Sequence, residues 1–161
     1  MTHTITHRLT YDAPVEAVAA MLADPAFREE VCRAQHVTEV NATVRTEGGR
    51  TIVKVDQWQP TAGIPSFAKK IVGDRTNIVQ DEVWTSPTRG DITVTIPGKP
   101  GDMTGTAVLE PTPEGGTVET VTLTIKVKIP VVAGKIENLI GDLLLKALKA
   151  ENRVGREYLA R

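Results

Sequence analysis

The fold is decided by the stretch that ends the chain, residues 120–159, which reads TVTLTIKVKIPVVAGKIENLIGDLLLKALKAENRVGREYL. From Thr120 to Ile129 polar and apolar residues alternate, a pattern typical of a half-buried strand with one wet face. Pro130 ends this strand, because proline has no backbone N–H to donate to a sheet. From Val131 to Leu159 the apolar residues recur at helical spacing and predict one long amphipathic helix.

The predicted helix is long enough to lie across a whole sheet, since about 29 residues at ~1.5 Å each span roughly 44 Å. Its apolar arc and the apolar face of the preceding strand are expected to enclose a pocket of about 300–1,000 Å³. Glu137, at the border of the arc, is expected to reach solvent. The residues expected to line the pocket are Val121, Leu123, Ile125 and Val127 on the strand, and Ile136, Leu139, Ile140, Leu143 and Ala147 on the helix.

Length and composition indicate an ordinary globular protein. The 161 residues are expected to form a single domain, 1–161, which is large enough to fold without disulfides or metals. A net charge of -1 gives no field that favours nucleic acid. Cys32 is the only cysteine, which excludes a disulfide framework and fits a reducing compartment. No secretory signal and no apolar run of membrane-spanning length is visible, so we expect a cytoplasmic protein without integral membrane association.

The rest of the sequence predicts one strand, two short helices and then a run of antiparallel strands. The expected strands cover 2–11, 36–46, 50–59, 77–85, 89–96, 103–110 and 120–129. The expected short helices cover 14–22 and 25–34, and the second has a start signal in Asp24 followed by Pro25. With the long helix at the end, this order favours the α+β class.

This order of elements resembles the helix-grip fold of the START-like (SRPBCC, Bet v 1-like) superfamily, over essentially the whole chain. Within that superfamily, the run Lys126-Val127-Lys128-Ile129-Pro130 followed by Gly134-Lys135-Ile136-Glu137 is similar to the actinobacterial domain-of-unknown-function 2505 family. The resemblance implies a curved antiparallel sheet of about six to seven strands that wraps around the C-terminal helix and encloses a ligand cavity. It implies no particular activity, because fold alone does not determine function.

Few polar residues fall on the faces that are expected to point inward. Strand parity places His7 and Tyr11 among apolar neighbours, and helical spacing places Glu151 and Tyr158 near the apolar arc. These four are the candidate polar groups of the cavity. His7 could equally be a satisfied core or sheet-edge histidine. Glu151 could equally reach past the sheet edge to a surface arginine, because a lone buried carboxylate is costly.

Two further features concern the edges of the expected cavity. The segment 60–73 carries Ile64 and Phe67 between proline and glycine residues, which indicates a lid, or else a loop or short helix that plugs one end. Trp84 shares strand parity with Gln80 and Glu82, which fits the outer face of the sheet or a strand end where the pattern slips, while a bulge would turn the ring inward, so its orientation stays open.

The sequence carries no strong catalytic signature. It has no phosphate-binding loop, no metal-spaced pair of His or Cys and no nucleophile elbow, so no catalytic residue, metal or cofactor is assigned. The leading hypothesis is a monomer or weak homodimer that binds an apolar small molecule, lipid-like or polycyclic, for transport, sequestration or sensing. One alternative is an enzyme resembling polyketide cyclases or aromatases, and another is a non-catalytic protein-interaction module with an incidental cavity.

Overall fold

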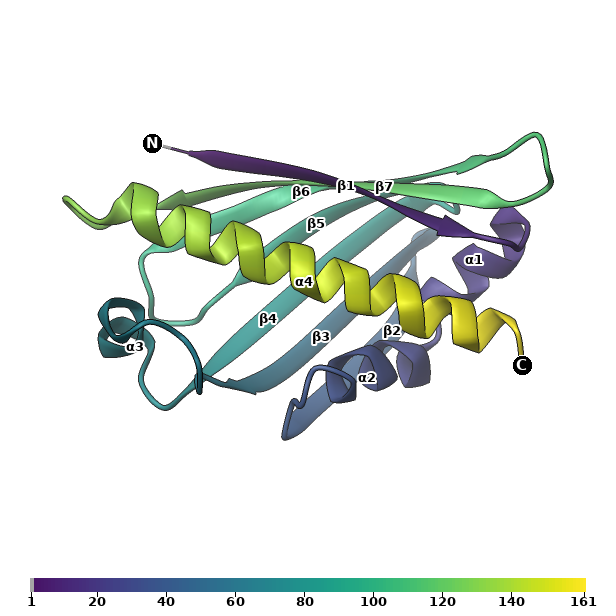
Figure 1. The fold of residues 1–161 in the computed structure, drawn as a ribbon. Helices are drawn as coiled ribbons and strands as arrows, with labels where there is room; N and C mark the ends of the chain where they lie inside the picture. Colours follow the sequence, from purple (N-terminus) through teal and green to yellow (C-terminus); the bar gives the residue numbers. More distant parts are fainter. Residues whose placement is uncertain (1) are drawn as a thin grey trace.

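Residues 2–161 are described by a computed structural model, and they build a sheet of seven antiparallel strands (Figure 1). The strands are β1 (His3–Tyr11), β2 (Glu39–Glu47), β3 (Arg50–Pro60), β4 (Arg75–Ser86), β5 (Arg89–Thr95), β6 (Gly101–Pro111) and β7 (Thr117–Val127). Their spatial order is β1-β7-β6-β5-β4-β3-β2, so β2 to β7 form a meander and β1 lies at the edge beside β7. This sheet, with the helices that flank it, confirms the predicted α+β class.

The helices are α1 (Val15–Leu22), α2 (Pro25–Arg33), α3 (Ser66–Val72) and α4 (Ala133–Leu159). Figure 1 shows that α4 crosses one face of the sheet, with α1 and α2 near its C-terminal end. At the other end of α4, the Nζ atom of Lys135 lies 4.1 Å from the centre of the Phe67 ring in α3. The segment predicted to be a lid therefore contains a short helix that contacts the start of α4.

The inner face of the sheet, which is the face that α4 covers, is largely apolar. In β7 the residues Val121, Leu123, Ile125 and Val127 are all buried, as the alternation of the sequence predicts. Leu9 of β1 is buried on the same face. The hydrophobic core therefore lies between this inner face and the helices.

Two glycines bring α4 close to the edge strand β1. A Cβ atom on Gly141 would lie 2.6 Å from the imidazole ring of His3, and one on Gly155 would lie 2.7 Å from the ring of Tyr11. Both distances are shorter than a van der Waals contact, so only glycine permits this approach. The glycines inside the helix, which cost about 1 kcal/mol each in helix propensity, are thus explained by close packing.

This packing rotates α4 away from the orientation that the sequence predicted. Because the glycine side of the helix faces β1, the inward direction passes through Leu144 and Glu151 rather than Leu143. The prediction that Leu143 lines the cavity is wrong, since this side chain is 42% exposed. Ile136, by contrast, is buried as predicted.

The expectation that Glu137 reaches solvent is also wrong. Its side chain is 1% exposed, and its Oε2 atom accepts a hydrogen bond of 2.8 Å from the backbone N–H of Val127. The N–H group at the end of β7 would otherwise be buried without an acceptor, which is costly. The carboxylate of Glu137 therefore links the beginning of α4 to Val127, the last residue of β7.

We predict that Leu143→Ala lowers the free energy of unfolding by less than about 1 kcal/mol, because the side chain is largely exposed. The matched change Ile136→Ala should cost about 2–4 kcal/mol, because it empties a buried site. Urea denaturation of both variants measures the difference. Equal losses, or a larger loss for Leu143→Ala, would contradict the orientation of α4.

Candidate functional site

A buried ion pair joins α2 to the inner face of β4. The terminal nitrogens of Arg28 donate hydrogen bonds to both carboxylate oxygens of Glu82, at 2.8 and 2.7 Å. The Nε atom of Arg28 donates a third, of 2.8 Å, to the carbonyl oxygen of Leu22 at the end of α1. Asp24, which caps the first turn of α2 by accepting from Ala26 N–H at 2.9 Å, fixes the helix that presents this guanidinium.

Glu82 also receives hydrogen bonds from its own strand. The indole Nε1 of Trp84 donates to Oε1 at 2.8 Å, and the side-chain amide of Gln80 donates to Oε2. The sequence left the orientation of Trp84 open, and the structure shows that all three residues point inward, where Arg28 pairs with the carboxylate. Opposite Trp84, a Cβ atom on Gly90 would lie 2.6 Å from the indole, so glycine makes room for the ring.

Two further carboxyl groups lie near this pair. Glu151 of α4 is 13% exposed, and its Oε1 atom is 3.8 Å from Nη1 of Arg28. Glu119 is buried on β7 opposite Leu9, so Tyr11 is its diagonal neighbour on the same face of β1. We call Arg28, Glu82, Glu119 and Glu151 the charge cluster. Glu151 thus reaches a buried arginine instead of a surface one.

Two polar atoms beside the charge cluster have no hydrogen-bond partner within residues 2–161. They are the hydroxyl oxygen of Tyr11 and the Oε1 atom of Glu119. Buried polar atoms of native proteins are almost always paired, so each exception needs an explanation. Neither atom therefore uses its hydrogen-bonding capacity within the described residues.

The carboxyl groups of the charge cluster differ in the direction in which their pKa values are shifted. Burial alone would raise the pKa of Glu82, but the charge of Arg28 and the hydrogen bonds to the carboxylate lower it below its ordinary value. Burial, together with the charge of Glu151, raises the pKa of Glu119 well above its ordinary value. Burial raises the pKa of Glu151 to about 7, against the opposing effect of Arg28. At neutral pH, Glu82 is ionised and Glu151 can gain or lose a proton, whereas Glu119 holds its proton more tightly than an ordinary glutamate.

The inner side of α4 is less well covered in its middle than at its ends. Near the ends, Ile136 and Val154 are buried. In the middle, Ile140, Leu144 and Ala147 are only half-buried although they lie on the inward side. The middle of the helix therefore does not pack fully against the sheet.

The strand β4 shows a similar incomplete burial on the inner face of the sheet. Ile78 and Gln80 are half-buried on its inner face. The side-chain amide of Gln80 donates a hydrogen bond to Glu82. Both β4 and α4 extend between α3, near which they begin, and the charge cluster. We call this set of half-buried inward residues, Ile78, Gln80, Ile140, Leu144 and Ala147, the α4 groove. Between Ile140 and Glu151, α4 rises about 16 Å, at ~1.5 Å per helical residue.

The sheet side of the predicted pocket is more tightly filled than expected. Ile125, Val127 and Ile140 border a void of about 30 Å³, which has room for about one water molecule. Val121, Leu123 and the remaining predicted strand residues are buried in the core. The half-buried inward residues thus lie on β4 and α4 rather than on β7.

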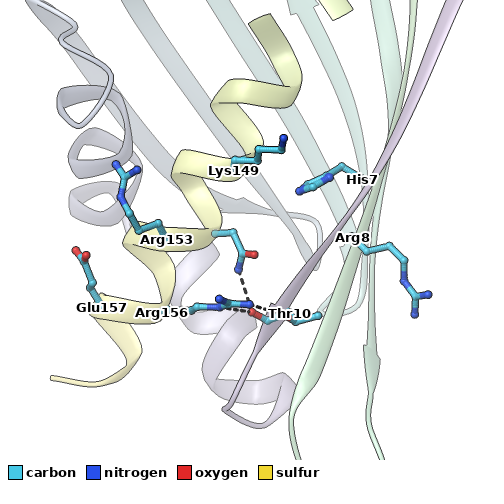
Figure 2. A pocket seen from close by; sticks show the side chains of 8 residues that line it. His7, Arg8, Thr10, Lys149, Arg153, Arg156 and Glu157 are labelled. Carbon is cyan, nitrogen blue, oxygen red and sulfur yellow. Dashed lines mark hydrogen bonds between the residues drawn. The ribbon is translucent and has the colours of Figure 1, made fainter. Parts of the chain in front are cut away.

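His7 faces a different hollow, on the outside of the molecule. This hollow has a volume of about 520 Å³ and lies between β1 and the C-terminal half of α4 (Figure 2). Asn152 and Arg156 bridge it by donating hydrogen bonds of 2.9 and 3.1 Å to the carbonyl oxygen of Thr10. Figure 2 shows the imidazole of His7 directed towards Lys149. His7 therefore does not join the charge cluster, contrary to its predicted role.

Other predicted residues also have structural roles. The hydroxyl of Tyr158 donates to Asp24 Oδ2 at 2.6 Å, and its ring packs on Phe27 with centroids 5.3 Å apart, so Tyr158 is not a polar group of the cavity. Burial raises the pKa of the Cys32 thiol to about 11, which disfavours a reactive thiolate. Among residues 2–161, no group of His, Cys, Asp or Glu side chains is arranged to hold a metal ion. Across the same residues, no helix is long and apolar enough to cross a membrane.

The sequence contained a signal for part of the charge cluster that our reasoning did not use. Glu119 has the same strand parity as Val121 and Leu123, so the alternation extended back by two residues places it inward. Glu82 shares parity with Ile78, which is also inward. Nothing in the sequence pairs either residue with Arg28, because the pairing depends on how α2 lies against the sheet.

We predict that Arg28→Met lowers the free energy of unfolding by about 3–5 kcal/mol, because it leaves Glu82 buried without its counter-charge. The double change Arg28→Met with Glu82→Leu should recover most of this loss, because no unpaired ion then remains. Guanidinium denaturation measures both. A loss below about 1 kcal/mol for the single change would contradict the assignment of a buried ion pair.

We predict that stability falls as the pH rises from about 5 to about 7. Glu151 binds its proton more tightly in the folded chain than in the unfolded one. The free energy of unfolding therefore falls as the pH rises towards about 7, the pKa of Glu151 in the folded chain. The loss should be on the order of 2–3 kcal/mol. Glu151→Gln should reduce this slope in urea denaturation curves and leave the part that Glu119 contributes, since its pKa is also raised, whereas the exposed control Glu157→Gln should retain the full slope. An unchanged slope in Glu151→Gln would contradict the prediction.

Comparison with known proteins places the chain in a family. Residues 6–159 match the family described as protein of unknown function (DUF2505). An uncharacterised protein of Mycobacterium tuberculosis is 35% identical over 95 residues, a match that spans 56% of this chain and 55% of that protein. The aligned part is thus about half of that relative's length.

Solved structures share the fold at low sequence identity. An aromatase/cyclase from a Streptomyces species has a TM-score of 0.70 at 13% identity, covering 100% of this chain and 95% of the other. A START superfamily protein from Mycobacterium smegmatis has a TM-score of 0.63 at 17% identity, covering 94% of this chain and 97% of the other. At such identities the likeness shows the fold alone. The chain therefore belongs to the DUF2505 family of proteins of unknown function, with the fold of the START/Bet v 1-like superfamily.

Proposed function

We propose that the protein binds a small elongated molecule in the α4 groove, with the apolar body between β4 and α4 and a polar head at the charge cluster. The observation that carries this proposal is the half-buried state of Ile140, Leu144 and Ala147, which face inward in the middle of a helix whose ends are buried. A largely apolar lining with a few convergent polar groups is the usual composition of a small-molecule site.

The charge cluster gives the groove a polar end. Gln80 and Glu151 are only half-buried, so they connect the buried members of the cluster to the groove. The unpaired atoms of Tyr11 and Glu119 supply a donor and an acceptor at the same end. A ligand with an apolar body would gain about 25 cal/mol for each Å² that it buries, and its head would gain specificity from these groups.

The opposite end of the groove is where a ligand would enter. Phe67 of α3 contacts Lys135 at the start of α4, and Ile71 of α3 is half-buried against the core. Movement of α3 would open the groove without breaking the sheet, which is the role proposed for the lid residues Ile64 and Phe67. The void of about 30 Å³ beside Ile140 then marks the part of the interior that a ligand would enlarge.

A second candidate function is acid–base catalysis at the same polar end. It is favoured by Glu151, whose pKa of about 7 suits proton transfer at neutral pH. The solved aromatase/cyclase with the same fold makes a polyketide-like substrate a reasonable choice for a search. Turnover of such a compound that Glu151→Gln reduces by about 10²–10⁴-fold would favour the enzyme over a simple binder.

We predict that an apolar ligand raises the melting temperature and that Leu144→Trp abolishes this effect. At a concentration of 100 Kd, a ligand should stabilise the fold by about 2.7 kcal/mol, or roughly 5–10 °C for a chain of this size. The indole in Leu144→Trp would fill the groove. The matched control Leu143→Trp places the same ring at the neighbouring exposed position and should leave binding unchanged.

A thermal-shift screen of lipids and polycyclic aromatics, repeated on both variants, provides the measurement. Loss of binding in Leu143→Trp but not in Leu144→Trp would contradict the proposed site. Failure of every apolar compound to bind would favour the interaction module instead.

A further inference from the structure

The charge cluster contains more negative groups than positive ones. Three carboxyl groups, those of Glu82, Glu119 and Glu151, share the single guanidinium of Arg28. That guanidinium is already committed, because it forms two hydrogen bonds to Glu82 and one to the carbonyl of Leu22. Glu151 has only a contact of 3.8 Å with it. The pair of Glu119 and Glu151 therefore lacks a counter-charge of its own.

Among residues 2–161, no other positive group faces this pair. The titratable groups around it are Tyr11 from β1, Arg28 and Cys32 from α2, Glu82 from β4, and the pair itself from β7 and α4. Within residues 2–161, Oε1 of Glu119 accepts no hydrogen bond although it is buried. A buried carboxylate is stable only if it is paired or protonated. In the free protein, protons relieve the excess of negative charge.

We propose that the polar end of the α4 groove takes a nitrogen cation, and that the ligand is an amphiphilic amine with an apolar body. This inference rests on the proposed function and adds the chemical class of the ligand. An ammonium group supplies the missing positive charge, and its N–H donors match the unpaired acceptor on Glu119 and the carboxylate of Glu151. A carboxylate or phosphate head would add another negative charge to the cluster and is rejected.

The test uses three probes with the same apolar body: n-decylamine, n-decanol and n-decanoate, each titrated into the intact protein by calorimetry at pH 7.5. The amine should bind about tenfold more tightly than the alcohol, and the acid should not bind. In Glu151→Gln the affinities of amine and alcohol should fall within about threefold of each other. The exposed control Glu157→Gln, on the same helix, should keep the full preference for the amine.

A second measurement on the unaltered protein does not depend on any variant folding. At pH 6.5 the amine should release a proton from the carboxyl pair as it binds, which appears as a binding enthalpy that depends on the ionisation enthalpy of the buffer. The alcohol should show no such dependence. Equal affinity of amine and alcohol, without proton release, would overturn this inference and leave the proposed groove intact. Failure of all three probes to bind would overturn both.

Discussion

The rest of the structure depends on the buried ion pair between Arg28 and Glu82. It is the direct polar link between α2 and the centre of the sheet, and its guanidinium also holds the end of α1 through the carbonyl of Leu22. The same helix α2 holds the C-terminal end of α4, because Asp24 accepts a hydrogen bond from Tyr158. The guanidinium of Arg28 and the helix cap Asp24 therefore connect the sheet, the short helices α1 and α2, and the long helix α4.

A buried ion pair of this kind is a poor way to increase stability. Apolar residues of the same volume would often stabilise a core as well or better, because they need no desolvation of charge. The two carboxyl groups beside the pair make the cost larger, since burial and neighbouring carboxylates raise the pKa values of both. The structural requirement for α2 explains Arg28 and Glu82. It does not explain Glu119 and Glu151, which is why we assign them to ligand recognition.

Much of the fold was predictable from the sequence, because the periods of its apolar residues are clear. The alternation in β7 and the helical spacing after Pro130 correctly predicted the inward strand residues and the long helix. The predictions failed where tertiary packing overrides a local pattern. Leu143 faces outward because Gly141 and Gly155 turn α4 towards β1. The orientation of Trp84 stayed open, because it depends on the pairing of Glu82 with Arg28 from a distant helix, and strand parity cannot predict that pairing.

The central claim is that a small molecule binds between β4 and α4, and methyl-resolved NMR tests it most directly. A stabilising apolar compound is titrated into protein with labelled isoleucine, leucine and valine methyl groups. The account predicts that the methyl signals of Ile78, Ile140 and Leu144 shift together, whereas those of the exposed Val131 and Leu143 stay in place. Shifts confined to Val131 and Leu143, with Ile78 and Leu144 unchanged, would contradict an interior site.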